Sequence, residues 1–403
     1  MANMLPAMGV SLLSPNIPAL NDIFGHQSGG AYLVSMALTI PALAIALLSS
    51  FAGFLVDRIG RRKSLLASLG LYAVFGVAPA FSESLQVFVV MRALLGIVEA
   101  VIMTSSFALV ADYFHGSERN RWLSYNTSFT AVASIFVYII AGALGTFGWQ
   151  YPFLFYGIAA PIFLLAVLVV WEPSRRQLVV DERVEDIARS AVGVPATASP
   201  VPFLFFTVIL VSVLAGALFF VIPLQTAVYL GERTSITSAQ TGILISIATV
   251  GNAIGALSFR YFANYRTGTV LSGCLLLSSF GLFALPFAHG AVSITAAAFV
   301  NQLGAGMLPA LLMAAAMRLT RAQWRGRGGG LWWASFSIGN FLSPIIMVRI
   351  VSAVGSLQNA FMLVGIVSIL VGLLSLLVGT FGWLSGPRPD RHEQSAIVPA
   401  TDV

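Results

Sequence analysis

Residues 53–63 read GFLVDRIGRRK, and this short polar stretch separates two long apolar runs at 30–55 and 64–82. Four of its residues are basic and one is acidic, in a chain of which only 9% is charged. Because Lys and Arg in the short loops of membrane proteins collect on the cytoplasmic side, the stretch predicts a cytoplasmic loop between two membrane spans.

The composition of the whole chain agrees with this prediction. Of 403 residues, 58% are hydrophobic, whereas soluble domains have about 45–50% apolar and about 25% charged residues. Too few charges remain to cover the surface of a soluble protein of this length, which excludes a water-soluble enzyme. We therefore expect an all-α polytopic membrane protein, in which each span takes about 20 apolar residues.

Apolar runs bounded by Gly, Pro and charged residues predict twelve transmembrane helices. They cover residues 3–20, 30–55, 64–82, 86–111, 122–146, 152–171, 202–230, 239–261, 268–287, 292–317, 329–352 and 358–383. The first run starts almost at Met1 without a basic segment, so we interpret it as a span and not as a cleaved signal.

The longest polar connection divides the chain into two halves. We expect an N-terminal six-helix bundle at 1–171, a cytoplasmic linker at 172–201, a C-terminal six-helix bundle at 202–384 and a cytoplasmic tail at 385–403. Gln150 and Phe153 recur as Gln358 and Phe361 at one common offset, which favours two pseudo-repeated bundles. The segments on one side hold 18 of the 21 Lys and Arg residues, so both termini are predicted to be cytoplasmic.

Other classes of function find no support in the sequence. The single cysteine, Cys274, excludes an intrachain disulfide and a Cys-based metal site, and the four histidines lie in polar segments, so we expect no metal. No H-E-x-x-H, G-x-S-x-G or G-x-x-x-x-G-K-[ST] motif occurs, which argues against a membrane enzyme and an ATP-driven pump. The net charge of +6 reflects the basic residues on the predicted cytoplasmic side, so we expect no nucleic-acid partner. We also expect no cofactor, with a proton gradient as the energy source.

The loop at 53–63 resembles the motif G-x-L-x-D-R-x-G-R-R/K of the major facilitator superfamily, and the span plan extends the resemblance over the chain. The resemblance implies a cytoplasmic gate motif made of Gly53, Asp57, Arg58, Gly60, Arg61 and Arg62. Gly53 would let two helices approach, and the arginines would pair with acids or helix C-termini. The alternative is simple anchoring by positive charge, which is equally plausible for Arg62 and Lys63.

Two charges lie within a predicted span. Arg92 and Glu99 both fall in 86–111 and are seven residues apart, which places them on one helix face about 10 Å apart along the axis. Because an ionisable group at membrane depth is costly, it is by default a functional hypothesis. Glu99 could carry a proton across, and Arg92 could stabilise the ionised form or bind an anionic substrate. The alternative is a structural tie.

This span also resembles family motifs. Arg92 and Gly96 match R-x-x-x-G, whose arginine is associated with proton coupling in drug/proton antiporters, while L-G-x-x-E-A at 95–100 is similar to organic-anion symporters and spinster-type proteins. In the fifth span, Val137-Tyr138 and Ala141-Gly142 stand where those antiporters usually carry Gly-Pro and Gly-Gly. The direction of transport therefore stays open.

In this superfamily the first, fourth, seventh and tenth spans usually line a central cavity, with contributions from the second, fifth, eighth and eleventh. The resemblance implies a substrate cavity lined by polar and aromatic residues from these spans: Asn16, Tyr32, Asn126, Gln225, Tyr229, Asn301, Gln302, Trp332, Trp333 and Phe336. Polar groups facing lipid would be unsatisfied, so they are expected to face protein or water. Interhelical hydrogen bonds for the Asn residues, and an interfacial belt for Trp332 and Trp333, are the alternatives.

Together these features predict a multi-pass secondary active transporter of the inner (cytoplasmic) membrane, working by rocker-switch alternating access. We expect proton-coupled efflux of a small amphiphilic compound, with Glu99 as proton carrier. Proton-coupled uptake of a small organic anion bound by Arg92 and spinster-like transport of a lipid or lysolipid are the alternatives. The expected partners are a small-molecule substrate and the lipid bilayer, and the protein is expected to be monomeric.

Overall fold

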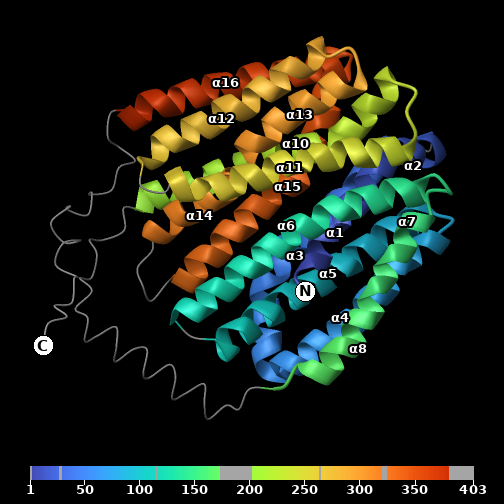
Figure 1. The fold of residues 1–403 in the computed structure, drawn as a ribbon, viewed down its shortest axis with the longest axis vertical. Helices are drawn as coiled ribbons and strands as arrows, with labels where there is room; N and C mark the ends of the chain where they lie inside the picture. The colour runs from blue at the N-terminus through green and yellow to red at the C-terminus, as the bar shows by residue number, and fades with distance from the viewer. Residues whose placement is uncertain are drawn as a thin grey trace, which may run out of the picture.

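The computed structural model describes residues 2–26, 30–114, 116–172, 202–262, 265–319 and 325–380. These residues are helical and contain no strand, which confirms the predicted all-α class. Figure 1 shows two groups of helices side by side, α1–α8 in blue to green and α10–α16 in yellow-green to red. Apart from Glu172, the predicted linker lies outside the described residues, as does the tail at 385–403.

The first group contains eight α-helices, the first two being halves of one broken helix. Its elements are α1 (Met4–Leu13), η1 (Ser14–Asn16), α2 (Ile17–Phe24), α3 (Gly30–Ile59), α4 (Arg61–Val77), η2 (Ala78–Phe81), α5 (Leu85–Tyr113), α6 (Gly116–Gly145), α7 (Tyr151–Leu154), η3 (Phe155–Ile158) and α8 (Ala159–Val169). The break after α1 has a simple cause, because Pro15 and Pro18 provide no backbone N–H for the helical ladder.

The described part of the second group contains seven α-helices and one short 3-10 helix. They are α10 (Pro202–Arg233), α11 (Ser238–Phe262), α12 (Thr267–Ala284), η4 (Leu285–Phe287), α13 (Ala291–Ala305), α14 (Leu308–Arg318), α15 (Arg325–Val354) and α16 (Leu357–Thr380). Each group has its own buried apolar core, formed around α1, α4 and α5 in the first and around α10, α12 and α13 in the second.

Within the described residues, nine helices are long and apolar enough to cross a membrane, or ten if the bent pair Met36–Ser49 and Phe51–Ile59 forms one span. The predicted first span corresponds to the broken α1–α2 pair, and the apolar part of the predicted fifth span is shorter, at Phe129–Gly145. The count of twelve and the cytoplasmic location of both termini stay predictions that are consistent with this fold.

Two ends of the bundle are distinguished below. The basic end carries the junction of α3 and α4 with the gate motif, and is the expected cytoplasmic side. The opposite end carries α2 and α7, at the right of Figure 1.

The two groups pack against each other along α6 with α11 and along α3 with α15. Near the opposite end, Gly142 of α6 faces Gly242 of α11 so closely that a Cβ on Gly242 would lie 2.4 Å from the Tyr138 carbonyl oxygen. Ser14, at the break in the first helix, donates a hydrogen bond to the Pro223 carbonyl of α10. These contacts between the groups lie on the opposite-end side of the bundle.

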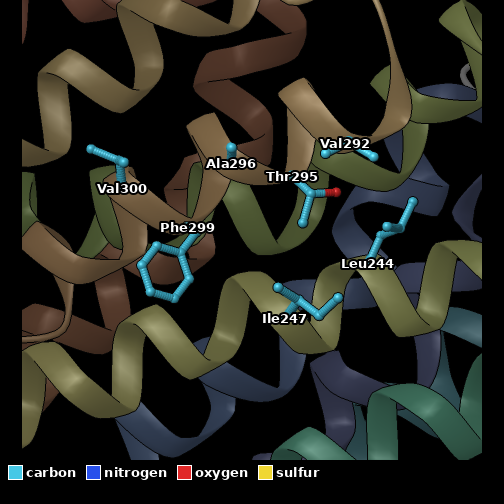
Figure 2. Close-up of a pocket in the computed structure, with 7 residues that line it drawn as sticks. All are labelled: Leu244, Ile247, Val292, Thr295, Ala296, Phe299 and Val300. Atoms are coloured by element: carbon cyan, nitrogen blue, oxygen red, sulfur yellow. The ribbon is translucent and has the colours of Figure 1, made fainter.

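One groove lies between α11 and α13 near the opposite end (Figure 2). It has a volume of about 370 Å³, and its walls are apolar apart from one threonine: Leu244, Ile247, Val292, Thr295, Ala296, Phe299 and Val300. The Thr295 hydroxyl already donates to the Ala291 carbonyl at 2.8 Å. The groove therefore offers no polar donor to a ligand, and none of the predicted cavity residues lines it.

Candidate functional site

Arg92 and Glu99, both on α5, are completely enclosed, with 0% and 1% of their surface exposed. The guanidinium of Arg92 donates to three other elements. Its Nε bonds to the Ala37 carbonyl of α3 at 2.9 Å, Nη1 to the Tyr156 hydroxyl of η3 at 2.8 Å, and Nη2 to the Gly9 carbonyl of α1 at 3.4 Å. The sequence-based expectation that the two charges share one face of a span therefore corresponds to one buried cluster.

Glu99 is the less satisfied member of this cluster. Its Oε1 is buried and has no hydrogen-bond partner among the described residues. The α1 backbone covers it at Gly9, where a Cβ would lie 3.5 Å from Glu99 Oε1 and 3.4 Å from Arg92 Nη2. A buried carboxylate without partners is costly, whereas the protonated acid is much less so. This enclosure makes Glu99 the candidate for reversible protonation in the described part of the chain.

Two tyrosines complete the cluster, and both were missed by sequence reasoning. Tyr72 of α4 donates to the Leu5 carbonyl at 2.5 Å, and its ring lies 5.5 Å from that of Tyr156 between centroids. Gly76 makes room for Tyr156, because a Cβ there would lie 2.5 Å from the Tyr156 Cβ. A tyrosine or glycine in an apolar run carries no pattern of its own, so only the fold reveals these neighbours.

Two asparagines of the predicted cavity, Asn16 and Asn301, form hydrogen bonds between helices. Asn16 donates to the carbonyls of Leu12 at 3.2 Å and Ala141 at 3.1 Å. Asn301 of α13 donates to both the carbonyl and the hydroxyl of Ser278 on α12, each at 2.8 Å.

Gln302, next to Asn301, accepts a hydrogen bond from Asn252 of α11 at 3.1 Å. This network joins three helices of the second group. It matches the alternative in which polar residues tie helices together.

The remaining cavity candidates are scattered over the second group and the ends of the bundle. Trp332 and Phe336 stack at 5.7 Å in a buried core of the second group, while Trp333 is exposed. The Tyr229 hydroxyl donates to the Leu285 carbonyl at 3.0 Å.

Gln225 and Asn126 are half-buried on α10 and α6, and the side chain of Tyr32 lies outside the described residues. The cavity list as a whole stays a prediction.

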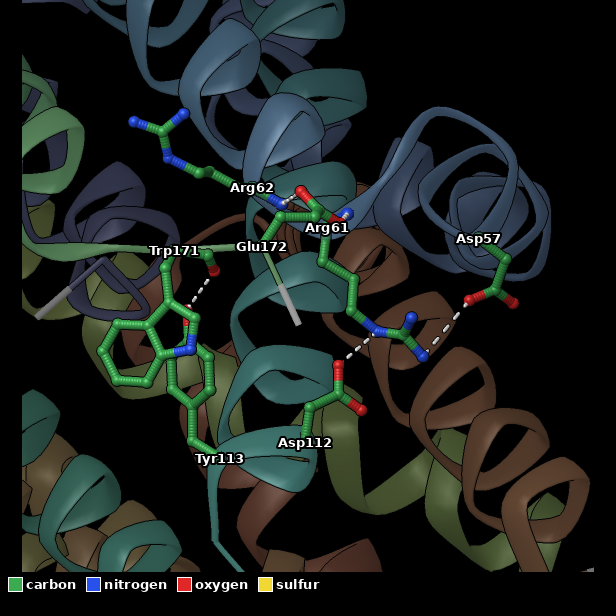
Figure 3. Close-up of polar contacts among 7 residues, drawn as sticks. All are labelled: Asp57, Arg61, Arg62, Asp112, Tyr113, Trp171 and Glu172. Carbon is green, nitrogen blue, oxygen red and sulfur yellow. Dashed lines mark hydrogen bonds and ion pairs between the residues drawn. The ribbon is translucent and has the colours of Figure 1, made fainter. Parts of the chain in front are cut away.

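The gate motif forms an ionic cluster at the basic end (Figure 3). Arg61 at the start of α4 lies between two acids: its Nε is 2.5 Å from Asp112 of α5, and its Nη2 is 3.7 Å from the exposed Asp57 of α3. Burial raises the pKa of the Asp112 carboxyl, and the positive charge of Arg61 opposes that shift. Gly53 is not a position of close approach here, since a Cβ would meet only Thr104 at 4.0 Å.

Glu172, the first residue of the predicted linker, binds to the same loop. Its two carboxylate oxygens accept hydrogen bonds from the backbone N–H groups of Arg61 at 2.7 Å and Arg62 at 2.9 Å. The first N–H groups of a helix lack partners within the helix and favour a negative charge. Arg62 in turn donates to the Val167 and Val170 carbonyls at the end of α8, at 3.0 and 2.7 Å.

The residue before Glu172 fixes the same segment. The Tyr113 hydroxyl donates to the Trp171 carbonyl at 2.5 Å, and the two rings stack with centroids 4.2 Å apart. The end of α8 is therefore attached to both α4 and α5 at the gate motif, as Figure 3 shows.

Gly60 joins α3 to α4 with a φ of 107° and a ψ of 146°, a region that only glycine adopts readily. A Cβ there would also lie 3.0 Å from Glu172 Oε1. We expect Gly60→Ala to destabilise the protein by about 1–3 kcal/mol, measured as a lower midpoint of thermal unfolding in detergent. Gly70→Ala on α4, where a Cβ would meet nothing within 4 Å, is the control and should not lower the midpoint. Equal midpoints for the two variants would contradict this assignment.

A two-part helical bundle with ionisable side chains at membrane depth is the architecture of a membrane transport protein. A family profile of the Major Facilitator Superfamily matches residues 1–344 and 225–401. The chain belongs to this family. It is a multi-pass transporter of the inner (cytoplasmic) membrane, and not an enzyme.

Characterised relatives cover most of the chain. Multidrug resistance protein 1 of Bacillus subtilis is 25% identical over 349 residues, covering 84% of this chain and 85% of that protein. Quinolone resistance protein NorA of Staphylococcus aureus is 24% identical over 345 residues, with the same coverage.

Among solved structures, a D-xylose-proton symporter superposes with a TM-score of 0.73 at 16% identity over 96% of each chain. A bacterial homologue of the human lysosomal transporter Spinster, in an inward-facing and occupied conformation, gives 0.72 at 14% identity over 95% of each chain. At such identities the likeness concerns the fold alone.

Proposed function

We propose that this transporter exports small amphiphilic compounds in exchange for protons, with Glu99 as the proton carrier. The observation that carries the proposal is the enclosed Glu99 carboxyl beside Arg92, with one oxygen left without a partner in the described part of the chain. A carboxyl in this position is neutral when protonated and pairs with Arg92 when ionised. Its two states can therefore favour two arrangements of the helices around it.

The relatives support export of drug-like compounds. Two of them are named for resistance to multiple drugs and to quinolones, and each aligns with most of this chain. The scarcity of charge inside the bundle, where Arg92 and Glu99 are the charged residues among the described buried ones, fits an amphiphilic substrate better than a strongly polar one.

The contacts of Arg92 weigh against uptake of a small organic anion. All three guanidinium nitrogens donate within the first group, to Ala37, Tyr156 and Gly9. A substrate carboxylate would have to displace these buried bonds, and truncated or unpaired buried polar groups are expensive. Arg92 is better placed to stabilise ionised Glu99 than to bind a substrate.

Alternating access by a rocker switch fits the distribution of contacts between the groups. Ser14 with Pro223 and Gly142 with Gly242 hold them together toward the opposite end. The described ion pairs of the gate motif, by contrast, join elements of the first group only. This arrangement supports a conformation closed at the opposite end, from which the basic end can open.

Transport assays in proteoliposomes test this proposal. We expect purified protein to concentrate ethidium, an amphiphilic cation, inside vesicles with an acidic lumen, and a proton ionophore to abolish the accumulation. Benzoate is tested in parallel as a small organic anion. Proton-driven movement of benzoate beyond that in protein-free vesicles, without accumulation of ethidium, would overturn the export proposal in favour of anion symport.

A further inference from the structure

The buried cluster around Glu99 contains a donor without an acceptor as well as an acceptor without a donor. The Tyr156 hydroxyl oxygen accepts from Arg92 Nη1 at 2.8 Å, and no hydrogen bond in the described structure uses its own proton. Glu99 Oε1 is the buried acceptor that lacks a partner. A hydroxyl has one donor and two acceptor positions, so Tyr156 can bind Arg92 and donate elsewhere at the same time.

Both groups face one small region, the space above Gly9 on α1. The position that a Cβ on Gly9 would take lies 3.9 Å from the Tyr156 hydroxyl, 3.5 Å from Glu99 Oε1 and 3.4 Å from Arg92 Nη2. The absence of a side chain at Gly9 leaves this region free for the three polar groups. Both oxygens lie within 4 Å of this one position, so a change in the side-chain conformation of Glu99 can bring donor and acceptor closer.

Packing against neighbouring residues fixes the position of the Tyr156 ring. It packs against Gly76 of α4, where a Cβ would lie 2.5 Å from its Cβ and Cγ, and against the ring of Phe153 at 6.4 Å. This packing directs the hydroxyl toward Arg92 and Gly9. Other titratable groups near Glu99 in the described structure are Arg92 on its own helix and Tyr72 on α4, and α1 and α3 have none at that depth.

We propose that Tyr156 is a positioning residue of the proton site, which orients Arg92 and donates its hydroxyl proton to Glu99 when Glu99 is ionised. Ionised Glu99 then has two partners, the charge of Arg92 and the Tyr156 hydroxyl, and protonated Glu99 needs neither. Tyr156 thereby sets the pH at which Glu99 exchanges its proton. The inference rests on the proposed role of Glu99, but its test does not depend on transport.

Tyr156→Phe tests the inference, because it removes the hydroxyl and keeps the ring that fills the space at Gly76. Infrared difference spectroscopy of the purified protein follows the carboxyl band of protonated Glu99 against pH, with Glu99→Gln identifying the band. Loss of a hydrogen bond to the charged form favours the protonated form. We therefore expect the midpoint of the Glu99 titration in Tyr156→Phe to move to higher pH by about one unit, a tenfold change in proton affinity.

Tyr72→Phe is the matched control. Tyr72 is equally buried and its ring lies beside Tyr156, but its hydroxyl already donates to the Leu5 carbonyl at 2.5 Å. We expect this variant to leave the midpoint within a few tenths of a unit. An unchanged midpoint in Tyr156→Phe, an equal shift in both variants, or no titration of Glu99 in the parent protein would each overturn the inference.

Failure of the proposed function gives a different result. In one outcome, the titration midpoint of Glu99 depends on Tyr156 while the Glu99→Gln variant still accumulates ethidium from a pH gradient. This result would support the positioning role of Tyr156 and contradict the coupling role of Glu99. If Glu99→Gln abolishes accumulation and Tyr156→Phe leaves the midpoint unchanged, the coupling role stands and the inference falls.

Discussion

Proteoliposomes containing Glu99→Gln should show no accumulation of ethidium from a pH gradient, while still binding the dye. Exchange of one proton for one monovalent cation is electroneutral, so a gradient of two pH units can drive about 100-fold accumulation in the parent protein, tenfold per unit. Glutamine keeps the size of the side chain and cannot release a proton. The ratio of ethidium inside to outside the vesicles should therefore fall to about one, the value that passive equilibration gives.

The measurement pairs dye uptake with binding of ethidium by fluorescence anisotropy in detergent. Glu83→Gln is the control, because Glu83 is an exposed acid just before the same helix, α5. This variant should accumulate ethidium like the parent protein. If Glu99→Gln retains gradient-driven accumulation, Glu99 is not the proton carrier.

The second large effect is expected at the contact between the two groups. Gly242→Leu should prevent closure of the opposite end, because even a Cβ there would lie 2.4 Å from the Tyr138 carbonyl and 2.9 Å from the Cα of Gly142. Overpacking of this kind costs about 1–3 kcal/mol, which shifts the equilibrium between closed and open forms about 5- to 150-fold toward the open one. Transport should fall on the order of tenfold as the closed form is depleted, since the cycle must pass through that form.

A single reporter cysteine measures this opening. Ala227→Cys, in a Cys274→Ser background, places a thiol in the buried cluster that Ala227 forms with Tyr138 and Ile245 between the groups. Gly242→Leu should accelerate its reaction with a water-soluble maleimide about 5- to 150-fold, by the same shift in equilibrium. Gly273→Leu on α12, where a Cβ would meet nothing within 4 Å, should leave the rate unchanged. Slow labelling in Gly242→Leu would show that the glycine pair does not control closure.

The sequence alone predicts the membrane class, the family resemblance and the two deep charges. These features depend on composition and local spacing, which tertiary structure does not change: residues 53–63 form the helix junction that the motif predicts, and Arg92 and Glu99 lie on one buried helix. Pro15 and Pro18 likewise mark the break in the first helix before any contact is known.

Sequence reasoning was weaker where a residue's role depends on which neighbour it faces. The family resemblance implies a substrate cavity that includes Asn301 and Gln302, yet these residues bond to Ser278 and Asn252 on adjacent helices. An asparagine in an apolar run must be satisfied, and the sequence cannot say whether a substrate, a water or a helix satisfies it. For the same reason the sequence does not indicate the role of Glu172. This residue accepts a hydrogen bond from the Arg61 backbone because α8 ends beside the start of α4.

By itself the sequence determined that the chain is a helical membrane protein and that Arg92 and Glu99 are charged residues within a predicted membrane span. Composition and position are enough for this, because burying a charge in lipid is costly and such residues therefore stand out. Only the tertiary structure decided what surrounds those charges. Gly9, Gly76 and Tyr156 come from three different segments of the chain. Helices that lack a side chain at the contact can approach closely. This approach brings the Tyr156 hydroxyl and the Gly9 carbonyl within hydrogen-bond distance of the buried Arg92 guanidinium. Contacts of this kind depend on distances between segments, which no local pattern in the chain records.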